Sequence, residues 1–514
     1  SVRSVSLIGE DKETTIIDGQ NTATCIKLSH NGYSSVTIKD FTVRNGYSAA
    51  SENNQGGGIM VGFHYDLVSL HDLIIENCTV ASDVYGGNGG GIYSTTSFLD
   101  ILNVDINQNT AEAQGGGIYA KNSVLTIENS TISSNTSSGS GGIYSESSSF
   151  TLDNVTVSNN SSTGDNGGVG GISINGNGSS GDRIRILNST ISNNTATGGS
   201  SVGGLFVSNV DSITLAYTEI SGNSGSSTGG MNTYQSQIIY MSNCLVVDNT
   251  GGIFGGVSFV STDHGGNDFP AQISNCTIAN NSYTYTGSGE RASQLMLERE
   301  SLVSVINSII SSNQSPGITL GNDWSDGPAV LTVNYSLIRD GQDSINIYTG
   351  SLNWGSGNID VNPMFVDTAN GNYHLLASSQ LINAGHPDST DSDGTRADIG
   401  AYPYLNTYSG PTWYITESGN NTTATGASGD PFRSIQAALN FGSDDDIAYV
   451  SAGTYVENIN FSGRNIKVVG ADRETTIIDG NQNGSVVTFE NGETSAALLS
   501  GFTIQNGYNT WGGG

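Results

Sequence analysis

The sequence is poor in basic residues, in proline and in cysteine, and it contains no long apolar run. Its 16 Lys and Arg stand against 47 Asp and Glu, which gives a formal charge of −31. Nucleic acids and anionic membranes are bound by releasing counterions through Lys and Arg, so this balance argues against both as partners and weighs against a polyanionic sugar. Because no apolar run is long enough to cross a bilayer, we expect no membrane insertion in this segment.

The four cysteines, Cys25, Cys78, Cys244 and Cys276, are too few for a disulfide scaffold and show no metal-ligand spacing. Three of them directly follow an Asn in a recurring motif in which other copies carry Ser or Val. This position therefore accepts small side chains. We expect buried free thiols, and a bridge between Cys244 and Cys276 stays open as an alternative.

Glycine is abundant, with 70 copies, whereas there are only 8 prolines. Together with frequent Ser, Asn and Thr, this composition predicts short strands joined by tight turns.

Two motifs recur along most of the chain. A Gly-Gly pair followed by an aliphatic residue returns every 25 to 33 residues, and motifs of the type NSTISSN alternate with it. Apolar residues alternate in the runs between them. A coil of this length can bury its apolar face only by stacking on its neighbours, so the pattern predicts an all-β fold, a parallel β-helix or solenoid.

A longer repeat encloses these coils. The hexapeptide TTIIDG occurs at 14–19 and again at 475–480, an offset of 461 residues at which further residues match. We therefore predict a β-helix module over residues 1–404, with its closing end at 360–404, a linker at 405–410, and the start of a second, homologous module at 411–514. We expect the chain to be cut from a longer array, with the first coil of the first module missing.

One helix is predicted, in GDPFRSIQAALNFG. Asp430 can cap it and Pro431 can begin it, while Phe432, Ile435 and Leu439 fall on one face. We expect this helix to cover the first coil of the second module.

The Gly-Gly-Ile-Tyr and Asn-Ser-Thr-Ile repeats resemble bacterial right-handed parallel β-helix proteins of the pectate-lyase-like superfamily, especially polymorphic outer-membrane protein and adhesin repeats. The segment YHLLASSQLINAG, followed by DSDGTRADIGAYP, is similar to the end of choice-of-anchor β-helix proteins. The resemblance implies a right-handed β-helix in an exported protein. It does not imply one activity, because this solenoid serves lyases, hydrolases, epimerases, adhesins and fibres.

The best candidate for catalysis is the stretch 264–300, where the Gly-Gly motif lapses. It gathers the charged residues and the histidine His264, Asp268, Glu290, Arg291, Glu298, Arg299 and Glu300. A carboxylate pair here could hydrolyse a glycoside. A solvated charge cluster is the favoured alternative, so we expect the chain not to be an enzyme, without settling the question.

The only metal candidate is calcium. In DSTDSDGTRAD, the residues Asp391, Asp393 and Asp398, with Asp388 nearby, place oxygen ligands at alternating positions before a glycine. The spacing departs from an EF-hand, and an acidic turn stays open as the alternative.

Three tyrosines suggest a binding surface. Tyr93, Tyr119 and Tyr144 follow the motif Ile in three consecutive coils, so they should point outward and stack about 4.8 Å apart. Such a stripe could hold a neutral sugar chain or a neighbouring protein. A ladder that only stabilises the fold is the alternative.

These observations favour an extracellular or cell-surface structural protein. Tandem β-helix modules would form a fibre, filament, sheath or adhesin, and the partners would be neighbouring modules or other copies. The alternatives are a secreted polysaccharide-active enzyme and a module that binds neutral polysaccharide.

Overall fold

The computed structural model describes residues 4–28, 35–49, 55–62, 67–81, 86–165, 167–177, 181–261, 270–287, 289–321 and 327–508. The chain forms two compact units. The first comprises Ser1–Val333 with Ile338–Gly355, and the second comprises Asn334–Leu337 with Ser356–Gly514. These two units are defined by spatial contacts, whereas the predicted modules, 1–404 and 411–514, are defined by the sequence repeat. The module boundaries stay a prediction.

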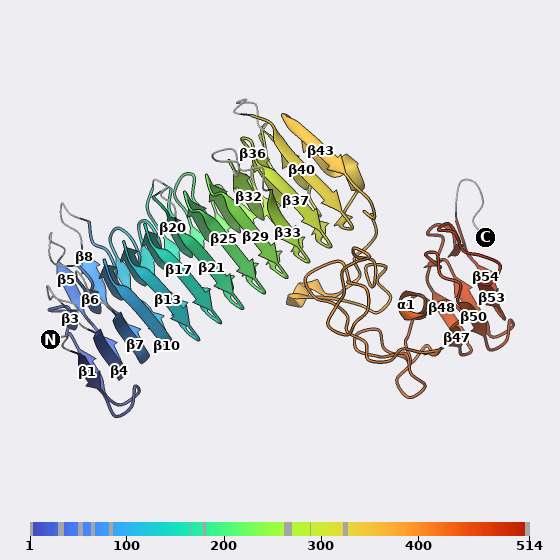
Figure 1. The fold of residues 1–514 in the computed structure, drawn as a ribbon, viewed down its shortest axis with the longest axis horizontal. Helices are drawn as coiled ribbons and strands as arrows, with labels where there is room; N and C mark the ends of the chain where they lie inside the picture. Colours follow the sequence, from blue (N-terminus) through green and yellow to red (C-terminus); the bar gives the residue numbers. More distant parts are fainter. Residues whose placement is uncertain are drawn as a thin grey trace. The chain divides into compact units, whose positions relative to one another are not determined.

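Three parallel sheets wind through residues 5–354. Figure 1 shows the strands of the largest sheet stacked with their arrows pointing the same way. The first sheet has 22 strands: β1 (Val5–Ile8), β2 (Ile16–Asp18), β4 (Ser35–Arg44), β7 (Leu67–Glu76), β10 (Phe98–Asn107), β13 (Val124–Glu128), β14 (Thr131–Ser133), β17 (Ser149–Asp153), β18 (Thr156–Ser158), β21 (Arg183–Leu187), β22 (Thr190–Ser192), β25 (Ser212–Ala216), β26 (Glu219–Ser221), β29 (Ile238–Ser242), β30 (Leu245–Val247), β33 (Ala271–Ser274), β34 (Thr277–Ala279), β37 (Leu302–Ile306), β38 (Ile309–Ser311), β40 (Ala329–Asn334), β41 (Leu337–Ile338) and β43 (Gly350–Trp354).

The second sheet has 12 strands: β3 (Ile26–Leu28), β6 (Ile59–Val61), β9 (Ile92–Thr95), β12 (Ile118–Lys121), β16 (Ile143–Glu146), β20 (Ile172–Asn175), β24 (Leu205–Ser208), β28 (Met231–Tyr234), β32 (Val257–Val260), β36 (Leu295–Glu298), β39 (Ile318–Leu320) and β42 (Ile345–Ile347). The third has nine: β5 (Tyr47–Ala49), β8 (Thr79–Ala81), β11 (Thr110–Ala111), β15 (Thr136–Ser137), β19 (Ser161–Ser162), β23 (Thr195–Ala196), β27 (Ser224–Gly225), β31 (Thr250–Gly251) and β35 (Ser282–Tyr283). The predicted all-β, parallel β-helix fold is confirmed.

The Gly-Gly-aliphatic motif begins eight strands of the 12-stranded sheet, namely β6, β9, β12, β16, β20, β24, β28 and β32. Its aliphatic residue pairs with the same position of the next coil, as in Ile92, Ile118, Ile143 and Ile172, and all four are fully buried. The second glycine of the motif is required by close approach, because a Cβ on Gly142 would come within 2.5 Å of the Gly171 carbonyl oxygen.

A ladder of buried asparagines runs through the interior. In each step the Oδ1 of one Asn accepts from the backbone N–H and the side-chain Nδ2 of the Asn in the preceding coil, at 2.9–3.0 Å. The members are Asn109, Asn135, Asn160, Asn194, Asn223, Asn249 and Asn281. Each amide is thereby satisfied without water, which lets a polar row lie inside an apolar core.

The second unit contains the helix α1 (Ile435–Phe441) and the 3₁₀ helix η2 (Thr368–Asn370), whereas the 3₁₀ helix η1 (Gly341–Ser344) belongs to the first unit. The strands of the second unit are β44 (Phe365–Asp367), β45 (Asn372–Leu375), β46 (Thr412–Ile415), β47 (Ile447–Val450), β48 (Gly453–Val456), β49 (Ile459–Asn460), β50 (Lys467–Gly470), β51 (Thr476–Asp479), β52 (Val487–Thr488), β53 (Leu498–Ser500) and β54 (Thr503–Gln505). Strands β46, β47, β50 and β53 form one parallel sheet. Among the described residues, none of the helices combines the length and the apolar character that spanning a bilayer requires.

The helix begins four residues later than predicted, and Asp430 does not cap it. Asp430 Oδ2 instead accepts from the backbone N–H of Thr425 in a turn, and Phe432 pairs with the strand β46. The carboxylate of Glu457 accepts from the N–H groups of Ile435 and Gln436, at 2.8 and 3.1 Å. The capping group therefore comes from a distant part of the sequence.

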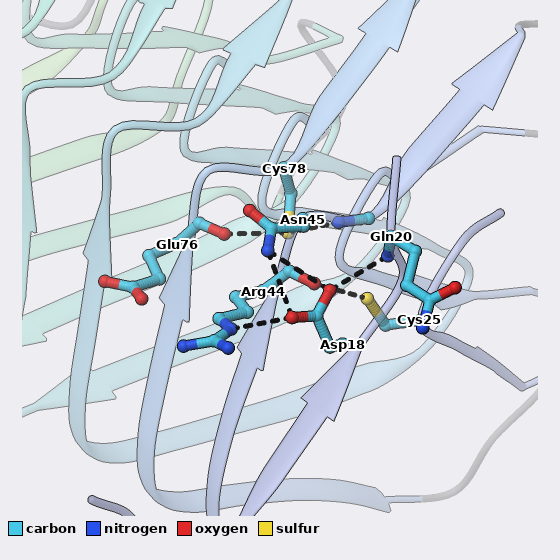
Figure 2. Close-up of polar contacts among 8 residues, drawn as sticks. Asp18, Gln20, Cys25, Arg44, Asn45, Glu76 and Cys78 are labelled. Atoms are coloured by element: carbon cyan, nitrogen blue, oxygen red, sulfur yellow. Dashed lines mark hydrogen bonds and ion pairs between the residues drawn. The ribbon is translucent and has the colours of Figure 1, made fainter. Parts of the chain in front are cut away.

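The two copies of the TTIIDG repeat adopt the same structure. Strand β2 pairs with β4 as β51 pairs with β54, in the same register. Figure 2 shows the Asp18 carboxylate accepting from the Gln20 backbone, Arg44 Nε and Asn45 Nδ2. In the second copy, Asp479 accepts in the same way from residues 481, 505 and 506.

Candidate ligand-binding site

The candidate site lies on the outer face of the 12-stranded sheet. Because side chains alternate along a strand, the residue after each buried motif aliphatic points away from the core. Strand register aligns Tyr93 with Tyr119 and Tyr119 with Tyr144.

The three tyrosine rings stack. The ring centroids of Tyr93 and Tyr119 lie 5.2 Å apart at an interplanar angle of 1°, and those of Tyr119 and Tyr144 lie 5.3 Å apart at 9°. Tyr119, in the middle, is 7% exposed, whereas the outer two are half-buried. We call these three residues the tyrosine ladder; their role as ligand-binding residues stays a prediction.

The ladder is uncharged. Burial, and secondly the nearby Glu146 carboxylate, raise the pKa of Tyr93, Tyr119 and Tyr144. Glu146 also forms an ion pair with Lys121, 2.8 Å between Oε1 and Nζ, so the charges beside the rings compensate one another. The tyrosines thus present neutral aromatic rings at any ordinary pH.

Beyond Tyr144 the outward row changes. Register places Ser173 next to Tyr144 and Phe206 next to Ser173. A hollow of about 300 Å³ opens at the serine, lined by both rings and by Gln114, Val169, Asn175 and Val202 among others. We call it the Ser173 hollow. Sequence reasoning missed it, although the break is visible as Gly-Gly-Ile-Ser after three copies of Gly-Gly-Ile-Tyr.

Polar groups around the Ser173 hollow are held in place. Ser208 Oγ donates to Asn175 Oδ1 at 2.8 Å, and Asn175 Nδ2 donates to Ser173 Oγ at 3.2 Å. Among the described residues, Gln114 Oε1 has no hydrogen-bond partner. The hollow therefore combines two aromatic walls with an oriented Asn175 amide, and Gln114 lies at its edge with its unpartnered oxygen buried.

The predicted calcium ligands lie in a turn whose carboxylates bind backbone N–H groups. Asp398 accepts from residues 383 and 404, Asp391 Oδ2 accepts from the N–H of Asp398, and Asp393 accepts from residues 395 and 406. Burial raises the pKa of Asp398, which is 2% exposed, to about 8. The N–H of Asp388 donates to His386 Nδ1.

Both carboxylate oxygens of Asp393 and of Asp398, and one of Asp391, thus already accept hydrogen bonds. Among the described residues, no group of three His, Cys, Asp or Glu is arranged to hold a metal ion. Calcium binding by Asp388, Asp391, Asp393 and Asp398 stays a prediction.

The end of the predicted catalytic stretch, residues 298–300, lies at a corner of the solenoid. Glu298 ends β36, and both Arg299 and Glu300 have positive φ, 49° and 56°. Other coils turn at the same corner with Asn122 or Ser147, also at positive φ. His264 and Asp268 lie outside the described residues. A catalytic role for Glu298, Arg299 and Glu300 stays a prediction.

All four cysteines are free thiols. Cys244 and Cys276 occupy adjacent coils, and the backbone N–H of Cys244 donates to Cys276 Sγ at 3.4 Å. Figure 2 shows Cys25 near Cys78, a proximity that the spacing in the sequence does not reveal. The expected free thiols are present.

No family model and no curated protein matches this sequence. Similar solved structures include the pectate lyase Pel9A, with 13% identity and a TM-score of 0.37 over 78% of this chain and 97% of that one. They also include the PL6 family alginate lyase AlyGC, with 13% identity and a TM-score of 0.25 over 93% of this chain and 69% of that one. These similarities concern the β-helix fold, which strand pairing establishes independently.

Proposed function

We propose that this chain is a glycan-binding module of an extracellular or cell-surface repeat protein, and that it holds neutral polysaccharide on the outer face of its 12-stranded sheet. The tyrosine ladder carries this proposal. Its last ring, Tyr144, lines a hollow that also offers hydrogen-bonding groups. Binding sites for small ligands commonly combine apolar walls with a few placed polar groups.

The chemistry of the face favours a neutral sugar. Aromatic rings present an electron-rich surface to the weakly positive C–H groups on the flat side of a pyranose ring. The formal charge of −31 opposes a polyanionic chain, because few basic groups are available to neutralise it.

The test is binding of soluble neutral polysaccharides and of polygalacturonate, measured by affinity electrophoresis. We expect retardation by at least one neutral polymer and none by the anionic one. Tyr144→Ala should weaken binding by about tenfold, as expected for loss of one buried aromatic contact. Tyr144→Phe keeps the ring and should retain binding.

Tyr217→Asn is the matched control. Tyr217 is 66% exposed on a different corner, and its φ of 50° is one that Asn adopts readily, so this variant removes an exposed ring without backbone strain. If no neutral polymer binds the native chain, or if Tyr217→Asn weakens binding as much as Tyr144→Ala, the proposal is wrong.

A second candidate, a structural role in a fibre or sheath, is favoured by a separate observation. The two copies of the repeat share register and hydrogen bonds, which suits modules in tandem. Neighbouring modules or other copies would then be the partners. Electron microscopy of the native material would show filaments with an axial repeat of one module, whereas isolated particles would contradict this role.

A further inference from the structure

The outward row of the 12-stranded sheet carries an aromatic ring on both sides of one small residue. Tyr144, Ser173 and Phe206 occupy one register position in three successive coils. Ser173 is 4% exposed and forms the floor of the Ser173 hollow. A serine therefore stands where the preceding coils place a stacked tyrosine.

The size of the hollow fits one ring. Two strand spacings separate Tyr144 from Phe206, about 9.6 Å. A carbon ring packs at about 3.5–4.0 Å from each aromatic face, so one puckered ring fits between them and two do not. The volume of about 300 Å³ lies at the lower end of the range for ligand pockets and agrees with a single ring.

The polar groups fit the hydroxyls of a sugar. Asn175 is held by Ser208, and Ser173 Oγ accepts from Asn175, which leaves the serine proton to donate. Gln114 lines the same space, and its Oε1 is buried and has no partner among the described residues. Rotation about the broad terminal torsion of Gln would turn this amide toward the hollow. An apolar aromatic ligand would leave these groups unused.

We infer that the Ser173 hollow binds a single pyranose ring of a neutral glycan, inserted between Tyr144 and Phe206 in the place that a tyrosine takes in the preceding coils. This inference rests on the proposed function and specifies its binding site. The ring continues the ladder, so the rest of the glycan leaves the hollow toward solvent.

The decisive variant is Ser173→Tyr, which supplies the missing ring from the protein itself. The new side chain should stack on Tyr144 as Tyr119 does, so the thermal midpoint should be unchanged or higher. Binding of cellotetraose, xylotetraose, mannotetraose and maltotetraose is measured by isothermal titration calorimetry. Whichever of these binds the native chain should bind Ser173→Tyr at least about tenfold more weakly.

Two further variants separate filling from simple disturbance. Ser173→Ala leaves the hollow open and removes only the hydroxyl that donates to the sugar, so it should weaken binding by about threefold, clearly less than Ser173→Tyr. Asn232→Tyr adds a ring on the same face, one coil beyond Phe206, where the hollow is not reached, and should bind as the native chain does.

The outcomes distinguish the two proposals. If no tetrasaccharide and no neutral polymer binds the native chain, the proposed function fails. If one binds, but folded Ser173→Tyr binds it equally well, the hollow is not the site and only this inference fails. A Ser173→Tyr variant that does not fold leaves the decision to Phe206→Ala, which should weaken binding by about tenfold and which overturns the inference if it does not.

Discussion

The two copies of the TTIIDG repeat make the same hydrogen bonds but differ in burial. Val5 and Leu7 are 56% and 41% exposed, whereas the matching Ile466 and Val468 are fully buried. The turns around Asp18 and Asp479 nevertheless have the same hydrogen bond, from the backbone N–H two residues further on to the Asp Oδ1. The motif thus specifies its own polar contacts, whereas burial of its apolar residues depends on what packs against it.

In the second copy, the covering element is known. Ile466, Val468 and Ile478 share one apolar core with the helix residues Ile435 and Leu439. The helix is seven residues long, too short to be stable by itself. Its stability therefore comes from this packing and from the Glu457 cap.

The largest expected effect comes from removing the same side chain in both copies. Ile478→Ala should destabilise the second copy by about 2–5 kcal/mol, because Ile478 is fully buried. Ile17→Ala should cost about half of that or less, because Ile17 is only partly buried. Backbone hydrogen exchange in β51 and β2 measures the two opening free energies. Equal losses would contradict the difference in burial.

A second effect depends on pH and belongs to the covering helix. Burial raises the pKa of Glu457 to about 7 from an ordinary 4.5, despite its two backbone hydrogen bonds. A carboxyl with a raised folded pKa contributes stability below pH 4.5 that is lost as the pH rises to about 7. The loss is on the order of 3 kcal/mol.

Glu457→Gln should remove this pH dependence. Urea unfolding at several pH values, followed by tryptophan fluorescence, measures it, because Trp413 is buried in the same core. Glu417→Gln is the control, since Glu417 Oε1 accepts from the N–H of Thr454 in the same region and does not cap the helix. An undiminished slope in Glu457→Gln would show that another group titrates.

The smallest expected effect comes from a substitution that gives the first turn the same side chain as the second. Hydrogen bonds from the Gln20 backbone, Arg44 and Asn45 lower the pKa of Asp18, and the second copy has Gln505 in place of the arginine. Arg44→Gln should raise the pKa of Asp18 while leaving it below its ordinary value, because the other two bonds remain. Carbon NMR titration of the carboxyl measures this shift, and an unchanged pKa would show that Arg44 contributes nothing.

The fold could be predicted because the repeats report it directly. In a parallel, in-register stack, one register position faces the same surroundings in every coil, so Ile92, Ile118 and Ile143 are chosen by the same constraint. The tyrosine stacking follows from the same logic. A residue type that returns at the period of the coil must lie in a row.

The sequence does not reveal contacts between residues that occupy different positions in their coils. The Glu457 cap joins residues 22 positions apart across different elements. Cys25 lies beside Cys78 although the two occupy different positions in their coils. Gly46 holds the position of Cys78 in the preceding coil, and because it has no side chain, the thiol of Cys25 fits there. The Ser173 hollow is an exception of another kind, since it is marked by a missing ring and not by a present one.

The asparagine ladder also bears on how such a chain changes over generations. Each Asn donates to the following coil and accepts from the preceding one, so any added coil finds both partners. Loss or duplication of a whole coil, such as residues 223–248, keeps every ladder amide bonded. An insertion or deletion of a few residues inside a coil instead moves one Asn out of the ladder, and its two neighbouring amides then lose a hydrogen-bond partner. Related chains should therefore differ in length by whole coils.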